Sequence, residues 1–278
     1  MGNLIWLASY PKSGNTWMRA FLHNVMLKNQ RPHGINRLDD LTTGDVTPEH
    51  YAAIAGRPLD GMTASDIAAL RAPVQAALAD QANGTRFIKT HSAVLEFAGH
   101  PTINVAVTAG AIYIIRNPLD VVVSFSHHLG RPVDDVIDLM ATQNSHTSMS
   151  ETLMIDFIGS WSQHVESWTG RPNPGLHVVR YEDMLDETHR TFAGVVKFLG
   201  LDVPRQHIER AVRHASFKVL RKQEETDGFV ERSEHAERFF RVGEKGQWCD
   251  VLSDDQVARV VESHRADMER FGYVPRGH

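Results

Sequence analysis

The chain has 278 residues, of which 34 are acidic and 29 are Lys or Arg, so its formal net charge at neutral pH is −5. This balance argues against a nucleic-acid partner bound through a generally basic surface, so a polyanionic ligand would need a local positive site. A single cysteine, Cys249, excludes an intramolecular disulfide framework and cysteine-rich metal sites. The sixteen His residues are scattered, and we predict no metal site.

The first predicted element is a buried strand, Leu4–Ala8, which leads into the polar loop of residues 10–17 (YPKSGNTW) and then an amphipathic helix to Leu27. A strand, a tight loop and a helix start in that order can hold a phosphate. Backbone N–H groups point into the loop, the helix N-terminus adds partial positive charge, and Lys12 adds a full charge. The loop is not a Walker A motif, because Lys12 precedes Gly14. The alternative is an ordinary strand–turn–helix with a surface lysine.

The middle of the chain alternates helical and strand patterns. Asp66–Gln81 is an Ala-rich helix with a Thr63 cap, and we expect Pro73 to kink or split it. Further strands are predicted at 86–89, 111–115 and 176–179, and further helices at 119–129, 152–168, 188–199 and 204–214. A last helix begins at a Ser253–Gln256 capping box and stops at Gly272.

This alternation predicts an α/β fold: a single domain, residues 1–278, with a central, mainly parallel sheet flanked by helices. Ligands of such sheets bind beyond the carboxyl ends of the strands, where the loop at 10–16 and the residues after Lys89 and Ile115 would converge. Residues 221–247 are rich in charge and Gly, so we expect either a solvated loop or a mobile lid over the ligand. No apolar run approaches the roughly 20 residues of a membrane span, and no room precedes the first strand for a signal peptide. We therefore expect a cytoplasmic protein without a membrane partner.

Two strand ends carry residues suited to chemistry. His91 follows the predicted strand at 86–89, and a His side chain titrates near neutrality, as a general base requires. Arg116 follows the strand at 111–115, and the helix begun by Pro118 places Ser124 two turns in. An Arg and a hydroxyl so placed can bind a phosphate, although Arg116 could instead pair with Asp120.

These motifs, from Leu4 to Trp248, resemble the sulfotransferases that use 3′-phosphoadenosine 5′-phosphosulfate (PAPS). The loop at 10–17 is similar to their 5′-phosphosulfate loop, and Lys89-Thr90-His91 matches the segment that carries their catalytic base. Arg116 and Ser124 match their 3′-phosphate site. The segment from Arg241 to Trp248 resembles their Arg-Lys-Gly-x-x-Gly-x-Trp motif, with Val242 in place of the Lys.

The resemblance implies a set of site residues. His91, Lys12 and Lys89 would be catalytic, and the nucleotide would be bound by Lys12, Ser13, Gly14, Asn15, Thr16, Trp17, Arg116, Ser124, Tyr181, Ser216, Phe217, Arg241 and Gly243. Within this set, Tyr181 and the Ser216-Phe217 pair would contact adenine, with Trp17 on its other face.

The implied reaction is transfer of a sulfuryl group from PAPS to a hydroxyl of a small or medium-sized acceptor, without a metal. His91 would be the base, and Lys12 would stabilise the leaving phosphate of adenosine 3′,5′-bisphosphate (PAP). A P-loop small-molecule kinase and a non-catalytic nucleotide-binding module are the alternatives. Neither the acceptor nor the choice between monomer and homodimer can be read from the residues.

Overall fold

In the computed structural model, which describes residues 2–28, 30–150 and 152–278, the chain separates into two compact units. Each unit is assembled from three segments of the chain. The first unit contains the residues up to Tyr10, Thr42–Tyr113 and Leu139–Val178; the second contains Pro11–Leu41, Ile114–Asp138 and Val179–His278. The chain therefore passes from one unit to the other directly after its first strand.

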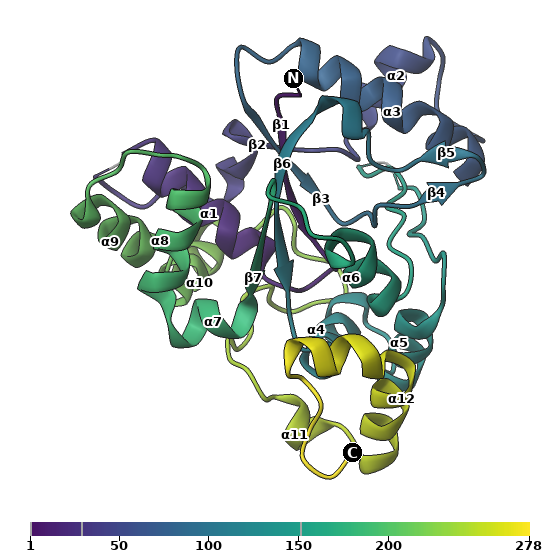
Figure 1. The fold of residues 1–278 in the computed structure, drawn as a ribbon, viewed down its shortest axis with the longest axis vertical. Helices are drawn as coiled ribbons and strands as arrows, with labels where there is room; N and C mark the ends of the chain where they lie inside the picture. Colours follow the sequence, from purple (N-terminus) through teal and green to yellow (C-terminus); the bar gives the residue numbers. More distant parts are fainter. Residues whose placement is uncertain (1, 29, 151) are drawn as a thin grey trace. The chain divides into compact units, whose positions relative to one another are not determined.

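A five-stranded sheet has the order β2-β3-β1-β6-β7. Its strands are β1 (Leu4–Ser9), β2 (Thr42–Gly44), β3 (Arg86–Thr90), β6 (Thr108–Ile115) and β7 (Leu176–Arg180) (Figure 1). Strand β3 runs parallel to both β1 and β2, and Ala8 lies opposite Thr90 in the register with β1. The predicted α/β class and the central, mainly parallel sheet are confirmed, and the predicted strands are all present.

One helix of the first unit contacts both a second helix and a short hairpin. Helix α3 (Ala64–Asp80) packs against α2 (Pro48–Ala55) and against β5 (His100–Pro101), which pairs with β4 (Glu96–Phe97). The Thr63 cap is confirmed, since its hydroxyl accepts from the amide of Asp66. Pro73 does not split α3, because the 17-residue helix continues past it to Asp80.

In the second unit, α1 (Asn15–Met26) packs against α9 (Arg205–His214), and α8 (Thr188–Phe198) packs against both α9 and α7 (Tyr181–Asp186) (Figure 1). Helix α4 (Pro118–Leu129) packs against α11 (Trp248–Val251) and α12 (Asp254–Phe271). The capping box of Ser253 and Gln256 is confirmed, and Gly272 ends α12 in the left-handed conformation. The remaining elements are η1 (Ile35–Asp40), η2 (Val105–Val107), α5 (Val133–Ala141), α6 (Trp161–Thr169) and α10 (Phe217–Asp227).

Residues 152–160 do not form the expected helix, so that prediction is wrong at its N-terminal half. Helix α6 begins at Trp161, where the Ser160 hydroxyl caps it by accepting from the amide of Gln163. Upstream, backbone amides bond to distant segments: Met154 donates to the carbonyl of Val46 at 2.8 Å, and Phe157 donates to the Ser92 hydroxyl at 3.1 Å. These tertiary hydrogen bonds replace the helical ones, and the apolar periodicity gave no sign of them.

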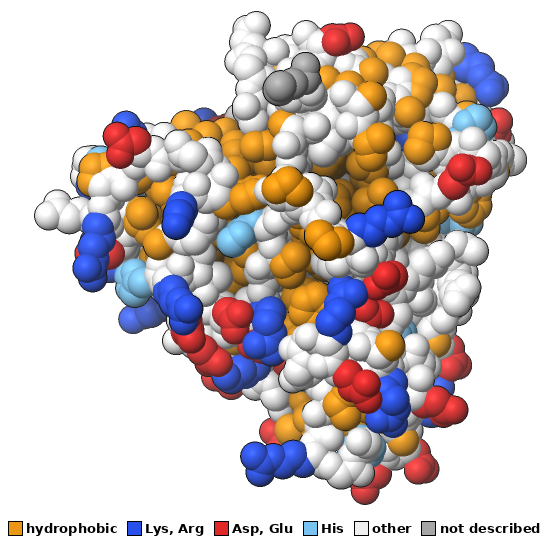
Figure 2. All heavy atoms as spheres, viewed as in Figure 1, with side chains coloured by type: hydrophobic (Ala, Val, Ile, Leu, Met, Phe, Trp, Pro, Cys, Tyr) orange, Lys and Arg blue, Asp and Glu red, His pale blue; other side chains and the backbone are white. Residues whose placement is uncertain are grey.

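Charged side chains of both signs are interspersed on the face drawn in Figure 2. This distribution agrees with the small net negative charge of the sequence. A site for a polyanion must therefore be built locally, from particular residues rather than from the surface as a whole.

Candidate active site

The loop between β1 and α1 has the geometry of a phosphate-binding turn. Gly14 caps α1 with φ of 106°, a conformation that favours glycine, and a Cβ there would lie 2.7 Å from the ring of Tyr181. Lys12 also has a positive φ, 66°, which strains a non-glycine backbone and is typical of functional loops. The buried Ser13 hydroxyl has no hydrogen-bond partner among the described residues. The loop is thus fixed by its surroundings and presents an unused polar atom.

Arg116 binds this loop from the end of β6. Its Nη1 donates to the Lys12 carbonyl at 3.0 Å, its Nη2 donates to the Glu244 carbonyl at 3.3 Å, and its guanidinium lies 4.3 Å from the centroid of the Tyr181 ring. The residue is 6% exposed, and its Nε is buried without a hydrogen-bond partner in the described parts of the chain. Burying a cation without a counter-ion is unfavourable, so Arg116 is suited to an anionic ligand.

The predicted alternative, a pair between Arg116 and Asp120, is not what the structure contains. The buried carboxylate of Asp120 accepts instead from the amides of Gly246, at 2.7 Å, and Trp248, at 3.2 Å. Asp120 therefore holds the segment that follows Arg241, and Arg116 keeps its charge uncompensated by a carboxylate over the described residues.

Arg241 brings a second cation to the same region. Burial, and then the positive charge of Arg116, lower the pKa of the Arg241 guanidinium, so the two cations are near enough for their charges to interact. Its Nη2 donates to the side-chain oxygen of Gln247 at 2.5 Å. The Arg241 charge also contributes, after burial, to lowering the pKa of His127, which lies one turn after Ser124 on α4. Two guanidinium groups and a hydroxyl-bearing helix face are thus assembled within the second unit.

Aromatic rings surround these polar groups. Trp17 lies in the first turn of α1 and packs edge to face on two rings. Its ring centroid is 6.0 Å from that of Tyr181 and 5.6 Å from that of Phe192. Phe217 begins α10 directly after Ser216, and a Cβ on Gly243, whose φ is 73°, would lie 2.3 Å from its ring. The indole N–H of Trp17 is buried and has no partner within the described ranges. Flat apolar surfaces with a spare donor suit a nucleobase.

The ammonium of Lys12 lies 3.9 Å from the centroid of the Phe239 ring. A cation on an aromatic face gains about 0.5–2 kcal/mol, depending on how far it is desolvated. This contact brings residue 239 to the phosphate loop. Asn15 and Thr16, which follow this loop, are buried in the first turn of α1.

His91 belongs to the first unit, directly after β3, and its ring is half-buried. Its Nδ1 lies 2.9 Å from the carbonyl of Ser9, the last residue of β1, and 3.3 Å from the Ser9 hydroxyl. A carbonyl can only accept, so Nδ1 carries the proton, and the neutral ring has its lone pair on Nε2. That tautomer is the one a general base needs. Lys89, two residues earlier and also half-buried, lies opposite Leu7 in the register.

A buried histidine that the sequence did not single out supports His91. His164, on α6, lies with its Nε2 3.2 Å from the His91 carbonyl and its Nδ1 2.8 Å from the Tyr113 hydroxyl. Burial lowers the pKa of His164 to about 3, so the ring is neutral. Its Nε2–H therefore donates to His91, and Tyr113 donates to its Nδ1. On the same helix, the indole of Trp168 donates to the Ser92 carbonyl at 3.1 Å.

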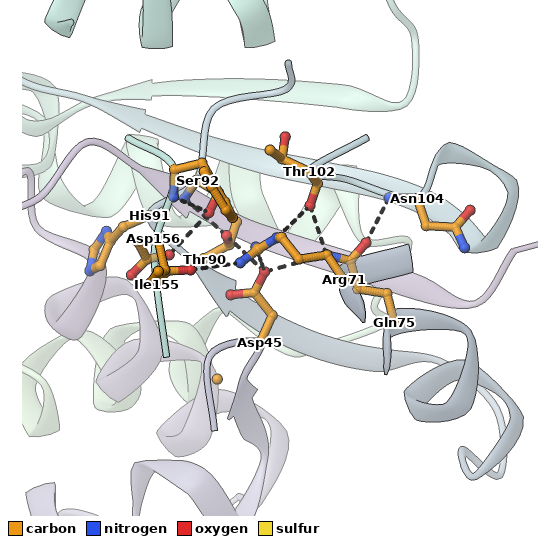
Figure 3. Close-up of polar contacts among 12 residues, drawn as sticks. Asp45, Arg71, Gln75, Thr90, His91, Ser92, Thr102, Asn104, Ile155 and Asp156 are labelled. Atoms are coloured by element: carbon orange, nitrogen blue, oxygen red, sulfur yellow. Dashed lines mark hydrogen bonds and ion pairs between the residues drawn. The ribbon is translucent and has the colours of Figure 1, made fainter. Parts of the chain in front are cut away.

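A buried ion pair lies beside this segment (Figure 3). Arg71 forms an ion pair with Asp45 and donates to the carbonyls of Thr102, at 2.9 Å, and Ile155, at 3.1 Å. The Thr90 hydroxyl donates to Asp45 at 3.2 Å. Figure 3 shows the His91 ring turned away from this pair. The side chain before His91 is therefore fixed by the network, while the imidazole stays outside it.

Comparison with known proteins shows the family of the chain. The family model for the sulfotransferase domain matches residues 3–272. The chain belongs to the sulfotransferase family. It is 26% identical over 277 residues to sulfotransferase 1A1 of Canis lupus familiaris, covering 96% of this chain and 83% of that protein. It is 24% identical over 272 residues to cytosolic sulfotransferase 14 of Arabidopsis thaliana, covering 91% and 72%.

A solved structure of retinol dehydratase, in a complex with retinol and PAP, superposes on this sulfotransferase with a TM-score of 0.64 and 19% identity, over 97% of this chain and 82% of that one. The likeness confirms the fold. Within the described ranges, no helix combines the length and apolar character needed to cross a bilayer. The same ranges contain no group of three or more His, Cys, Asp or Glu side chains that could hold a metal ion.

Two supporting residues of the sulfotransferase were missed by the sequence predictions. His164 was placed in a predicted helix but not given a role, since a histidine within an amphipathic pattern has no local mark of its partner. Arg71 carried a weak signal: it is a charged residue on the apolar side of an Ala-rich helix, where it is fully buried. Neither partner could be named, because Asp45 and the His91 carbonyl are distant in sequence.

Proposed function

We propose that this sulfotransferase transfers the sulfuryl group of PAPS to a hydroxyl of a small or medium-sized acceptor. The observation that carries the proposal is the buried guanidinium of Arg116, which interacts electrostatically with Arg241 and lacks a carboxylate partner in the described chain. Two cations held together in this way repel each other until an anion lies between them. A nucleotide with phosphates at both its 3′ and 5′ positions would supply such anions.

The residues of the second unit fit such a nucleotide. The amides of residues 12–16, the Ser13 hydroxyl and the Lys12 ammonium would hold the 5′-phosphosulfate. Arg116, Ser124 and Arg241 would hold the 3′-phosphate, and the rings of Trp17, Tyr181 and Phe217, with Ser216, would contact adenine. The unpartnered buried atoms of Ser13, Trp17 and Arg116 support this assignment, because a bound ligand would satisfy them. The PAP named in the retinol dehydratase complex supports the choice of nucleotide.

The proposed reaction needs one proton acceptor and one stabilised leaving group. His91 Nε2 accepts the proton of the acceptor hydroxyl as its oxygen attacks sulfur. The bond between sulfur and the 5′-phosphate oxygen breaks, and PAP leaves with the negative charge on that oxygen. Lys12 stabilises this developing charge, and Lys89 stabilises the sulfuryl oxygens. The products are the sulfated acceptor, PAP and a proton on His91.

Chain connectivity supports the pairing of His91 with Lys12. The His91 Nδ1–H donates a hydrogen bond to the Ser9 carbonyl, and Lys12 lies three residues after Ser9. Three residues of chain can separate the two Cα atoms, of Ser9 and Lys12, by no more than about 11 Å. The base and the leaving-group lysine are therefore tied to the same short stretch of backbone, whichever acceptor is used.

The finer assignments follow from the same proposal. The two units would work as one catalytic domain over residues 1–278, with residues 221–247 closing over the nucleotide. The retinol named in the neighbour's complex supports a small-molecule acceptor, and the cytosolic relative from Arabidopsis supports a cytoplasmic location. We propose that no metal takes part.

A screen of hydroxylated compounds with labelled PAPS, run with and without a chelator, tests the proposal. We expect label transfer to at least one aryl or aliphatic alcohol, at a rate that the chelator leaves unchanged. Turnover that requires ATP and Mg²⁺ would instead identify a kinase. Binding of PAP without transfer to any acceptor would leave only a nucleotide-binding module.

A further inference from the structure

A buried carboxylate outside the predicted site holds part of the nucleotide region in place. Glu224 lies on α10 one turn after Leu220, and both residues are buried. Its Oε1 accepts from the amide of Phe239 at 2.6 Å, and its Oε2 accepts from the amide of Phe240 at 2.9 Å. Both oxygens of one carboxylate are thus used on two successive backbone amides.

The position of this contact in the chain gives it its importance. Arg241 directly follows Phe240, and the Glu244 carbonyl that accepts from Arg116 is three residues further on. Asp120 holds the far end of the same stretch, through the amides of Gly246 and Trp248. The short segment that presents cationic and carbonyl groups to Arg116 is therefore anchored by a buried carboxylate at each end.

Glu224 also fixes the rings around that segment. Phe239 lies beneath the Lys12 ammonium, and its ring centroid is 4.8 Å from that of Phe229. The ring centroid of Phe240 is 6.1 Å from that of Phe217. Because the amides of residues 239 and 240 are tied to α10, the contact with Lys12 and the contact with Phe217 are set by one carboxylate.

We propose that Glu224 is a positioning residue of the nucleotide site, which keeps Arg241 close to Arg116 before the 3′-phosphate binds. The inference rests on the proposed function. Two neighbouring guanidinium groups repel, and a flexible segment would move Arg241 away until the anion arrived. The tie from Glu224 opposes this movement, so that less of the binding energy is used to order the segment.

The test compares Glu224→Ala and Glu224→Gln with Glu225→Gln as a matched control. Glu225 is adjacent on α10, but its carboxylate is half-exposed and pairs with Arg221 at 3.2 Å and Arg238 at 3.4 Å. Exposed ion pairs of this kind contribute little to stability. The two Gln variants remove the same charge from the same helix, and only Glu224→Gln removes an acceptor from a buried amide.

Calorimetric titration of each purified protein with PAP and with adenosine 5′-phosphate gives the decisive ratio. We expect Glu224→Ala to weaken PAP binding about 10-fold, through the cost of ordering Arg241 and its neighbours on binding. Adenosine 5′-phosphate has no 3′-phosphate and makes no use of Arg241, so its affinity should fall by less than that of PAP, about threefold or less, through the loosened contacts of Lys12 and Phe217 alone. The affinity of Glu224→Gln for PAP should lie between those of wild type and Glu224→Ala, and the affinity of Glu225→Gln should equal that of wild type.

Several outcomes would overturn the inference. A role confined to stability would lower the unfolding temperature and leave the ratio of the two affinities unchanged. An equal effect from Glu225→Gln would assign the effect to helix charge. If Glu224→Ala fails to fold, the ratio measured for Glu224→Gln decides by the same criterion. Wild-type protein that binds no PAP would contradict the proposed function itself, whereas normal wild-type binding with unaltered ratios would contradict only the role of Glu224.

Discussion

Two of the buried arginines, Arg71 in the first unit and Arg116 in the second, have opposite surroundings. Arg71, in the first unit, forms an ion pair with Asp45, and its other nitrogens donate to two carbonyls and to the Tyr51 hydroxyl. Arg116, in the second unit, has only two carbonyl acceptors, a ring face and an unpartnered Nε among the residues described. The two side chains have the same chemistry and nearly the same burial.

The difference separates scaffold from site. A guanidinium whose donors are all used, and whose charge is paired, holds protein segments together. One that is buried short of an anion is energetically poised to receive it. The same distinction applies between Asp120 and Glu224, which tie backbone amides, and Ser13, whose buried hydroxyl has no partner in the described chain.

The largest expected effect concerns His91, where the first unit departs from its role as scaffold. His91→Ala should lower kcat by about 10²–10⁴, the usual contribution of a general base, with PAP affinity nearly unchanged. Steady-state kinetics with an acceptor from the screen measures the effect. His189→Ala, on the exposed face of α8, is the control, and full activity of His91→Ala would show that the base lies elsewhere.

The next effect tests Arg71 as scaffold. Arg71→Met should reduce the free energy of unfolding by about 3–5 kcal/mol, because it leaves the Asp45 carboxylate buried without its cation. Urea denaturation measures the loss, and the double variant with Asp45→Asn should recover much of it. A selective loss of PAP affinity in Arg71→Met would place this arginine in the site and break the comparison.

For Arg116 we expect the reverse of Arg71, a loss of nucleotide affinity with little loss of stability. Arg116→Ala should weaken PAP binding about 10²-fold, since it removes a buried charge from the 3′-phosphate. Adenosine 5′-phosphate should be affected far less, and the free energy of unfolding should change little. Arg116→Lys keeps the charge but not the planar fork, and should be intermediate. Equal losses for both nucleotides would contradict the assignment.

The smallest effect is a pH dependence that sharpens the scaffold side of the comparison. Burial lowers the pKa of His164 to about 3, below its unfolded value of about 6.5. Between these values the unfolded chain binds more protons, so this histidine makes stability fall as pH falls from 6.5 towards 3. At pH 5 this histidine lowers the free energy of unfolding by about 2 kcal/mol. Urea denaturation measures the free energy of unfolding at pH 7.5 and at pH 5. The difference between the two values should be about 2 kcal/mol smaller in His164→Gln than in wild type.

Local signals in the sequence were sufficient for much of this protein. The loop of residues 10–17 follows its strand as predicted, His91 and Arg116 each follow a strand end, and the caps at Thr63 and Ser253 form. These features depend on residues within a few positions of each other. The helix predicted at 152–168 was wrong over residues 152–160, because backbone amides there bond to Val46 and Ser92 instead.

The sequence by itself therefore determined the order of the main strands and helices, the loop at residues 10–17 after the first strand, and the positions of His91 and Arg116 after strand ends. Only the tertiary structure decided which arginine is paired and which is not, which tautomer His91 adopts, and that Glu224 ties the segment carrying Arg241. The physical reason is that periodicity, caps and turns act over one or two turns of chain. Ion pairs and buried hydrogen bonds join residues far apart in sequence, and their partners are set only when the chain has folded.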